Sequence, residues 1–200
     1  MHETVKNLIN IQNLIKSKLS DLKLIDRSPK IIAVSKTFKL EHILPLIEYG
    51  HEDFGENKVQ EAIDKWADIK KNNNNLKIHL IGKLQTNKVK HAINFFDFIH
   101  SLDNEKLATK ISQEQKKLKI KPKIFIQINI GNELQKSGIK VDELEEFYQY
   151  CLKLDLNIVG TMCLPPINDD PEKYFLKINL LNKKLNFKEL SMGMSSDYLE

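Results

Sequence analysis

The stretch Ile31-Ile32-Ala33-Val34-Ser35-Lys36-Thr37 joins a short apolar run to three polar residues. An apolar run without alternation predicts a strand that is buried on both faces, as in a parallel sheet. Helical spacing of apolar residues precedes it over residues 3–24, and Ser28-Pro29 separates the two patterns. The chain therefore opens with a helix, a breaker, a buried strand and a polar turn.

The same alternation of strand and helix continues along the chain. We expect further helices over residues 40–49, 57–70, 86–95, 105–118, 142–154 and 171–185. We expect further strands over residues 52–54, 77–81, 97–100, 123–130, 157–162 and 188–192. Seven strands that alternate with helices predict an α/β protein with a parallel sheet. Because no linker rich in Pro, Gly or Ser divides the sequence, we expect one domain over residues 1–200.

The composition limits the class of protein. The chain has 200 residues, of which 41% are hydrophobic, enough for a substantial core. It has neither an apolar run of about 18 residues nor the layout of a signal peptide, so we expect no membrane association and a cytoplasmic location. The two cysteines, Cys151 and Cys163, form no CxxC pair, and the six histidines show no ligand spacing. We therefore expect a reducing compartment, no disulfide scaffold and no metal.

The charge pattern argues against a nucleic-acid partner. The formal net charge is only +4, and Arg27 is the only arginine. Recognition of bases and phosphates favours the planar fork of arginine over the point charge of lysine. Lysines spread over solvated helix surfaces explain the same composition.

Lys36 is the strongest candidate for chemistry. It directly follows a predicted strand, and parallel sheets place function at the carboxyl ends of their strands. The ordinary pKa of a lysine is about 10.4. Burial lowers that pKa and frees the amine, which can then attack an aldehyde to form a Schiff base. An ordinary solvated loop lysine remains the alternative.

Other polar residues follow the remaining strands. The turn Ser191-Met192-Gly193-Met194-Ser195 could bind an anion through backbone N–H groups, or it could merely cap a helix. Asn57 could hydrogen-bond a ligand hydroxyl or phosphate, or cap the next helix. His79 lies inside a predicted strand, where a core histidine paired with a neighbour is the plainer interpretation. The sequence has no GxGxxG, P-loop or GxSxG motif.

Seven blocks occur in one order along nearly the whole chain. They are Ala33-Val34-Ser35-Lys36-Thr37, Phe54-Gly55-Glu56-Asn57-Lys58-Val59-Gln60-Glu61, His79-Leu80-Ile81-Gly82-Lys83-Leu84-Gln85-Thr86-Asn87-Lys88, Ile99-His100-Ser101-Leu102-Asp103, Gln127-Ile128-Asn129-Ile130, Lys136-Ser137-Gly138 and Ser191-Met192-Gly193-Met194-Ser195. This ordered set closely resembles the YggS/PROSC family of pyridoxal 5′-phosphate (PLP) homeostasis proteins.

The resemblance implies a TIM (β/α)8 barrel of the alanine racemase N-terminal type, which is fold type III of the PLP enzymes. It implies that PLP is the cofactor and that Lys36 is the Schiff-base lysine. The cofactor-binding residues that we expect are Lys36, Asn57, His79, Ser191, Met192, Gly193 and Ser195.

The resemblance also implies a function in intracellular PLP homeostasis without established turnover. The expected partners are PLP and, as recipients, PLP-dependent enzymes in their apo form; members of the family are commonly monomeric. One alternative is a racemase-like enzyme, which needs a second acid or base across the ring from the lysine. The five tyrosines fall on predicted helices or near the end of the sequence, which counts against that alternative. The other alternative is a truncated remnant of such a protein that does not bind PLP.

One departure from the family concerns the last strand. In the family, a further strand carries an Arg that faces the pyridine nitrogen and a Gly-Thr pair that holds the phosphate. Here the sequence reaches Glu200 first, so we expect the eighth strand to be missing and the domain to be incomplete at its C-terminal end. A truncated record, a naturally shortened gene and a partner chain that closes the gap are three open explanations. An open edge would expose apolar surface and lower stability.

Overall fold

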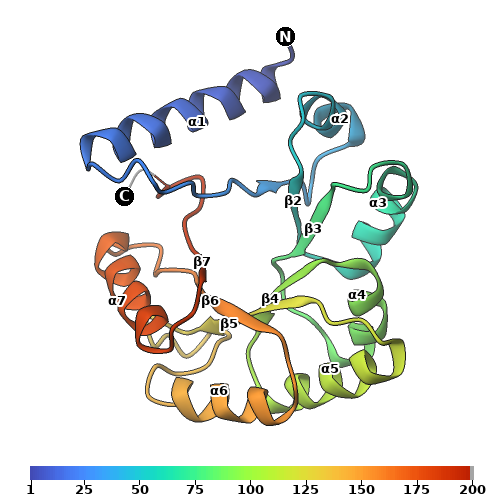
Figure 1. The fold of residues 1–200 in the computed structure, drawn as a ribbon, viewed down its shortest axis with the longest axis vertical. Coiled ribbons are helices and arrows are strands. Elements are labelled where there is room, and N and C mark those ends of the chain that lie inside the picture. Colours follow the sequence, from blue (N-terminus) through green and yellow to red (C-terminus); the bar gives the residue numbers. More distant parts are fainter. Residues whose placement is uncertain (199–200) are drawn as a thin grey trace.

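Seven parallel strands form one curved sheet with helices on its outer face (Figure 1). The computed structural model describes residues 1–198. The strands are β1 (Ala33–Val34), β2 (Asp53–Glu56), β3 (Lys77–Leu80), β4 (Phe98–Leu102), β5 (Lys123–Ile128), β6 (Ile158–Cys163) and β7 (Glu189–Ser191). The helices are α1 (Glu3–Asp21), α2 (Leu40–Glu48), α3 (Val59–Asn72), η1 (Thr86–Lys88), α4 (Val89–Phe95), α5 (Glu105–Leu118), α6 (Leu144–Lys153) and α7 (Pro171–Lys184).

Each strand pairs in parallel with the next one along the chain, in the order β1 to β7. The sheet is therefore an open, curled barrel with β1 and β7 as its two edge strands. The prediction of seven strands alternating with helices is confirmed. One expected helix, over residues 86–95, begins as the short 3-10 helix η1 before α4 continues it.

The prediction that residues 31–34 are buried on both faces is wrong. Ile31, Ile32 and Ala33 are only half-buried, and Val34 is 45% exposed. The physical reason is that β1 is an edge strand with a single neighbour, β2. An apolar run predicts that a segment is a strand, but its burial depends on whether strands lie on both sides of it.

Strand side chains alternate between the helices and the inner face of the sheet. Outward-facing residues such as Ile78 and Leu80 join the main core beneath the helices, in which Trp66 of α3 is fully buried against Phe54. On the inner face, Phe98 and Phe125 belong to a second, smaller apolar cluster. The period of two along each strand thus separates a large outer core from a lumen that is only partly apolar.

Strand β7 depends on a close approach to Gly160 of β6. A Cβ atom added at Gly160 would lie 1.8 Å from the carbonyl oxygen of Glu189, which is backbone and cannot move without moving the strand. Glu189 is also the residue with which Gly160 pairs in register. Only glycine therefore lets these two strands pair as they do.

We expect Gly160→Ala to lower the free energy of unfolding by about 3 kcal/mol, because the added methyl group must push β7 away from β6. Urea denaturation followed by circular dichroism measures this loss. Gly55→Ala is the matched control, because its Cβ would meet only side-chain ends, the nearest at 3.1 Å. Equal losses for the two variants would contradict the account of β7.

Candidate cofactor site at the carboxyl end of the sheet

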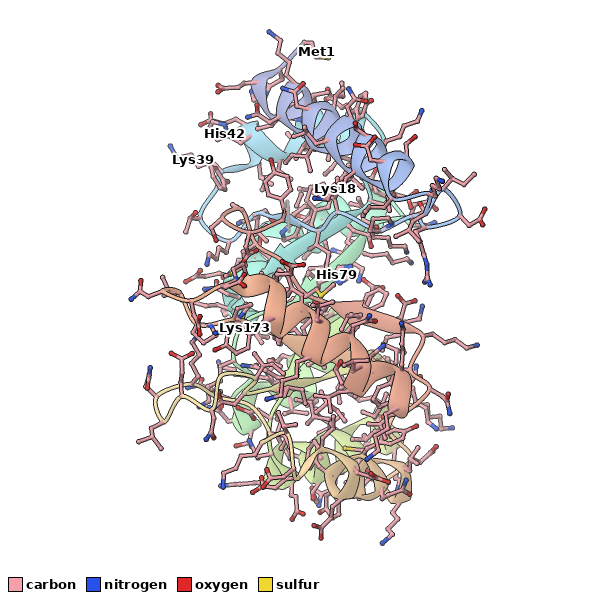
Figure 2. The ribbon with its side chains drawn as sticks, turned by 90° about the vertical axis from the view of Figure 1, so that its left-hand side faces the viewer. Met1, Lys18, Lys39, His42, His79 and Lys173 are labelled. Carbon is pink, nitrogen blue, oxygen red and sulfur yellow. The ribbon has the colours of Figure 1, made fainter. Side chains whose placement is uncertain are left out.

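The parallel sheet brings the predicted site residues to the carboxyl ends of its strands, which we call the carboxyl edge. Lys36 follows β1, Asn57 follows β2 and the turn of residues 191–195 begins at the end of β7. The helices that follow the strands also begin at this edge. Figure 2 shows two residues from such helix starts, Lys39 before α2 and Lys173 in α7, projecting from the same side of the molecule.

Lys36 itself is exposed to solvent. Within residues 1–198 its ammonium group has neither a hydrogen-bond nor an ion-pair partner. The expectation of a buried amine is therefore wrong for this structure, for the same reason as at Val34: β1 is an edge strand and no strand covers its other side. Another lysine at this edge, Lys136, is instead held by the Glu133 carboxylate at 2.6 Å and the Pro165 carbonyl oxygen at 2.9 Å.

The residue before Lys36 is fixed by a buried carboxylate. Ser35 donates from its hydroxyl to Oε1 of Glu56 at 2.8 Å, and its backbone N–H donates to the carbonyl oxygen of Gly55 at 2.9 Å. The same Oε1 accepts from Trp66 Nε1 at 2.9 Å and from Lys65 Nζ at 3.0 Å. Lys65 also donates to the Ser35 carbonyl oxygen at 2.7 Å.

The Glu56 cluster, formed by Ser35, Glu56, Lys65 and Trp66, is an anchor for the turn that carries Lys36. Glu56 is fully buried, and the Lys65 side chain is only 16% exposed. A buried carboxylate needs both an opposite charge and hydrogen-bond donors, and this cluster supplies them at Oε1. Within the described residues the second oxygen, Oε2, has no hydrogen-bond partner, so the carboxylate depends on the donors at Oε1.

Asn57 lies against the loop after β3. A Cβ atom at Gly82 would lie 2.2 Å from the carbonyl oxygen of Asn57 and 2.6 Å from its Cβ atom, so only glycine permits this contact. The capping alternative for Asn57 is wrong, because α3 has Lys58 as its N-cap residue. The close backbone contact holds Asn57 at the carboxyl edge of the sheet.

The turn after β7 is mostly exposed. Gly193 has φ of 85°, a conformation that favours glycine. The backbone N–H of Met194 donates to the Asp197 carboxylate, and the N–H of Asp197 donates to the Met194 carbonyl oxygen at 3.1 Å. Met192 and Ser195 are exposed, whereas Ser191 is half-buried and points its hydroxyl into the lumen.

A continuous chain of hydrogen bonds crosses the lumen to Ser191. Asp53 Oδ1 lies 3.0 Å from His79 Nε2, and His79 Nδ1 lies 2.9 Å from His100 Nε2. His100 Nδ1 in turn lies 2.9 Å from Ser191 Oγ. We call these four residues, from β2, β3, β4 and β7, the lumen chain.

The two imidazole rings of the lumen chain are locked in place. His79 stacks on Phe98 at 4.3 Å with 5° between the planes, and His100 stacks on Phe125 at 4.3 Å with 22°. Burial, with a smaller effect of His79, lowers the pKa of His100 to about 3. The hydrogen bond from His79 lowers the pKa of Asp53, so this carboxyl group is ionised at neutral pH. The interpretation of His79 as a core histidine with polar neighbours is confirmed.

The residues at this edge offer much of what PLP requires. The free amine of Lys36 suits an aldehyde, and Ser191, Asn57 and the backbone of the turn suit the oxygen atoms of a phosphate. Arg27 is the only arginine of the 200 residues, and the structure does not place it at this end of the sheet. Arg27 lies in a hollow beside residues that precede β1 and β2, among them Lys30 and Gly50, and so belongs to the amino ends of the strands.

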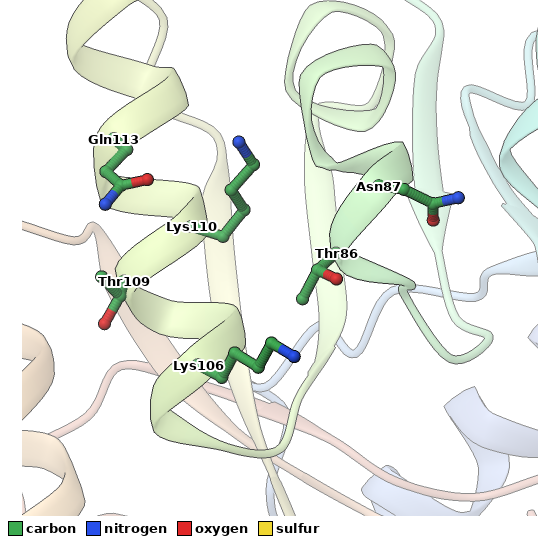
Figure 3. A pocket seen from close by; sticks show the side chains of 6 residues that line it. All are labelled: Thr86, Asn87, Lys106, Thr109, Lys110 and Gln113. Atoms are coloured by element: carbon green, nitrogen blue, oxygen red, sulfur yellow. The ribbon is translucent and has the colours of Figure 1, made fainter.

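A second hollow lies on the outer surface, in the groove between η1 and α5 (Figure 3). Its lining residues are Thr86, Asn87, Lys106, Thr109, Lys110 and Gln113. Figure 3 shows that the Lys106 side chain reaches across the groove toward η1. These side chains are partly or fully exposed, and none of them faces the lumen chain.

Four polar residues with structural roles at the site were missed in the sequence: Asp53, Glu56, Lys65 and His100. A signal for two of them was available, because Asp53 and His100 share with His79 the inward positions of adjacent strands. The signal for Glu56 is a carboxylate at an outward, core-facing strand position, which requires a charged partner.

Two negative findings concern the part of the chain that the structure describes. No helix within it has both the length and the apolar character needed to cross a membrane. Its His, Cys, Asp and Glu residues nowhere gather as a group of three that could hold a metal ion.

The chain is similar to proteins named for PLP. It is 36% identical to the pyridoxal phosphate homeostasis protein of Aquifex aeolicus (strain VF5) over 179 residues, which cover 84% of this chain and 78% of that protein. It is 34% identical to the protein of the same name from Pasteurella multocida (strain Pm70), over 96% of this chain and 87% of that protein.

Solved structures agree with this similarity. PipY of Synechococcus elongatus PCC7942 without PLP has a TM-score of 0.73 and 32% identity, over 92% of this chain and 91% of that one. PipY with PLP bound has a TM-score of 0.70 and 31% identity, over 94% and 91% of the two chains. The family model described as "Alanine racemase, N-terminal domain" matches residues 12–200. The chain therefore belongs to the alanine racemase N-terminal domain family and, within it, to the YggS/PROSC family of PLP homeostasis proteins.

Proposed function

We propose that this chain binds PLP through Lys36 and serves PLP homeostasis as a cytoplasmic, single-domain monomer. The observation that carries the proposal is the position of Lys36, an unpartnered primary amine at the same sheet edge as Asn57 and the Ser191 turn. The names of its relatives, and the PLP bound to PipY, support the same assignment.

PLP supplies an aldehyde that condenses reversibly with a primary amine. Lys36 provides that amine, and the Glu56 cluster holds the turn from which it projects. Asn57, Ser191, Met192, Gly193 and Ser195 line the same edge and bind the polar groups of the ligand. His79 acts from within the lumen, through His100 and Ser191, rather than by direct contact.

The site is suited to holding and releasing the ligand. The exposure of Lys36 leaves its amine open to water and to competing amines from other proteins. Two of the five tyrosines are hydrogen-bonded away from the site: Tyr150 bonds Thr109 between α5 and α6, and Tyr174 bonds Asp169 before α7. We therefore favour transfer of PLP to apo-enzymes over turnover of amino acids.

We expect Lys36→Ala to abolish covalent attachment of PLP, because Lys36 supplies the amine of the proposed attachment, whereas the Lys65 amine at the same turn is held by Glu56 and by the Ser35 carbonyl oxygen. The measurement is borohydride reduction of the protein–PLP mixture, followed by intact mass spectrometry. Lys83→Ala is the matched control, since Lys83 is also exposed and follows β3 at the same edge. Undiminished labelling of Lys36→Ala, or loss of labelling only in Lys83→Ala, would overturn the assignment.

We expect Lys65→Met to destabilise the protein by about 3 kcal/mol, because it leaves the Glu56 carboxylate buried without its cation. We also expect slower attachment of PLP, because the carbonyl oxygen of Ser35 loses its donor. Urea denaturation and stopped-flow absorbance measure the two effects.

Lys58→Met, at the N-cap of the same helix, is the control. It breaks only the exposed ion pair with Glu61, which we expect to contribute less than about 1 kcal/mol. If the two lysine variants lose the same stability, the Glu56 cluster is not the anchor described above.

A further inference from the structure

The direction of hydrogen bonding in the lumen chain is limited by its first member. The ionised Asp53 carboxylate can only accept, so His79 Nε2 must carry a proton and donate to it. With both rings neutral, His79 Nδ1 accepts from His100 Nε2–H, and His100 Nδ1 accepts from the hydroxyl of Ser191. In this state the hydroxyl proton of Ser191 is donated to His100 inside the lumen. At the carboxyl end of the lumen, which we call the mouth, Ser191 can therefore only accept a hydrogen bond.

The addition of one proton reverses the direction of the last two bonds. The proton of Ser191 moves to His100 Nδ1, the proton of His100 Nε2 moves to His79 Nδ1, and Ser191 takes a proton from the mouth. His79 then carries a positive charge beside Asp53, while His100 stays neutral with its proton on Nδ1. The Ser191 hydroxyl now accepts from His100, and its own proton is free to be donated to a ligand.

We infer that the lumen chain couples binding of an anionic ligand at the Ser191 turn to the uptake of one proton by His79. The inference rests on the proposed function, and it adds a proton-linked donor to the site. Ser191 is the contact residue, whereas Asp53, His79 and His100 are positioning residues that act through it. An anionic oxygen accepts strongly from a hydroxyl donor, so the ligand favours the protonated state of the chain.

The geometry lets the hydrogen bonds of the lumen chain reverse their direction without moving any heavy atom. Each proton travels along one existing hydrogen bond of 2.9 Å. His79 and His100 are 4% and 1% exposed, and stacking on Phe98 and Phe125 prevents either ring from turning. The proton is expected to enter at Ser191, because this half-buried residue ends β7 and is the member of the lumen chain that lies at the carboxyl end of the sheet.

The charges around His79 oppose one another. Asp53 of β2 accepts directly from His79 and stabilises a positive charge on the ring. Lys30 and His51 act on that carboxylate and weaken its effect. Lys123 of β5 places its Nζ 5.1 Å from the ring of Phe98, on which His79 stacks. The group of β4 that contacts His79 by a hydrogen bond is His100. The carboxylate is the nearest of these charged groups and the only one in contact.

The test uses pyridoxine 5′-phosphate, which has the phosphate of PLP but no aldehyde for Lys36. Calorimetry in buffers of different ionisation enthalpy gives the number of protons taken up on binding. We expect His100→Phe, which breaks the chain but can still stack on Phe125, to take up fewer protons than the wild type, by up to one. As the pH falls, wild-type affinity should rise relative to this variant, by up to about tenfold per pH unit wherever binding takes up one proton.

Two further variants complete the test. Ser191→Ala removes the end of the chain without touching the buried rings, and we expect it to lose the same proton uptake even if His100→Phe does not fold. His91→Asn changes an exposed histidine of α4 and should leave proton uptake at the wild-type value. In ¹⁵N spectra of the wild type, we expect ligand binding to convert His100 Nδ1 from an unprotonated to a protonated nitrogen.

The outcomes separate this inference from the proposed function. Equal proton uptake by the wild type, His100→Phe and Ser191→Ala, with binding retained, overturns the proton coupling and leaves PLP binding in place. Failure of the wild type to bind either pyridoxine 5′-phosphate or PLP overturns the proposed function and the coupling together. Reduced uptake in both chain variants, with an unchanged His91→Asn, supports the coupling.

Discussion

The alternation of side chains along β2 is the constraint on which the site depends. Four residues, Asp53-Phe54-Gly55-Glu56, send their side chains by turns into the lumen and toward the helices. One carboxylate therefore begins the lumen chain that ends at Ser191, and the other fixes Ser35 and, with it, the turn that carries Lys36. A slip of one residue in the pairing of β2 with β3 would remove both carboxylates from their partners.

The two carboxylates are neutralised in different ways. Glu56 accepts from the ammonium group of Lys65 at 3.0 Å and from Ser35 and Trp66 at the same oxygen, so this cluster is a fixed anchor. Asp53 faces His79, the one type of side chain whose charge ordinarily changes near neutral pH. The protein thus combines the Glu56 cluster, a fixed support for the turn that carries Lys36, with Ser191 on the opposite edge strand, β7, as a donor that the proposed proton uptake would adjust. A site that must both hold and release an anionic ligand can use both properties.

The sequence was sufficient for the order and type of the elements, since strands such as β5 carry an apolar run and the helices between the strands a 3.6-residue period. The helix expected over residues 105–118 has those bounds in the structure. The position of Lys36 at a strand end was also predictable, but its exposure was not, because burial depends on the neighbours of β1. The lumen chain was hidden for a related reason: Asp53 and Ser191 are 138 positions apart, and only the curvature of the sheet brings β7 opposite β2 and β3.

The exposure of Lys36 changes where the affinity of the site must come from. A primary amine in water forms a reversible bond with an aldehyde, and water or another amine can reach and displace it. Tight holding therefore depends on non-covalent contacts, which we have proposed to lie on the turn after β7. That turn is joined to the sheet by three strand residues, by the close approach at Gly160 and by the bond from His100 to Ser191. The histidine bond is the one of these three that a proton can reverse, so control of release is better placed in the lumen than at the reactive lysine.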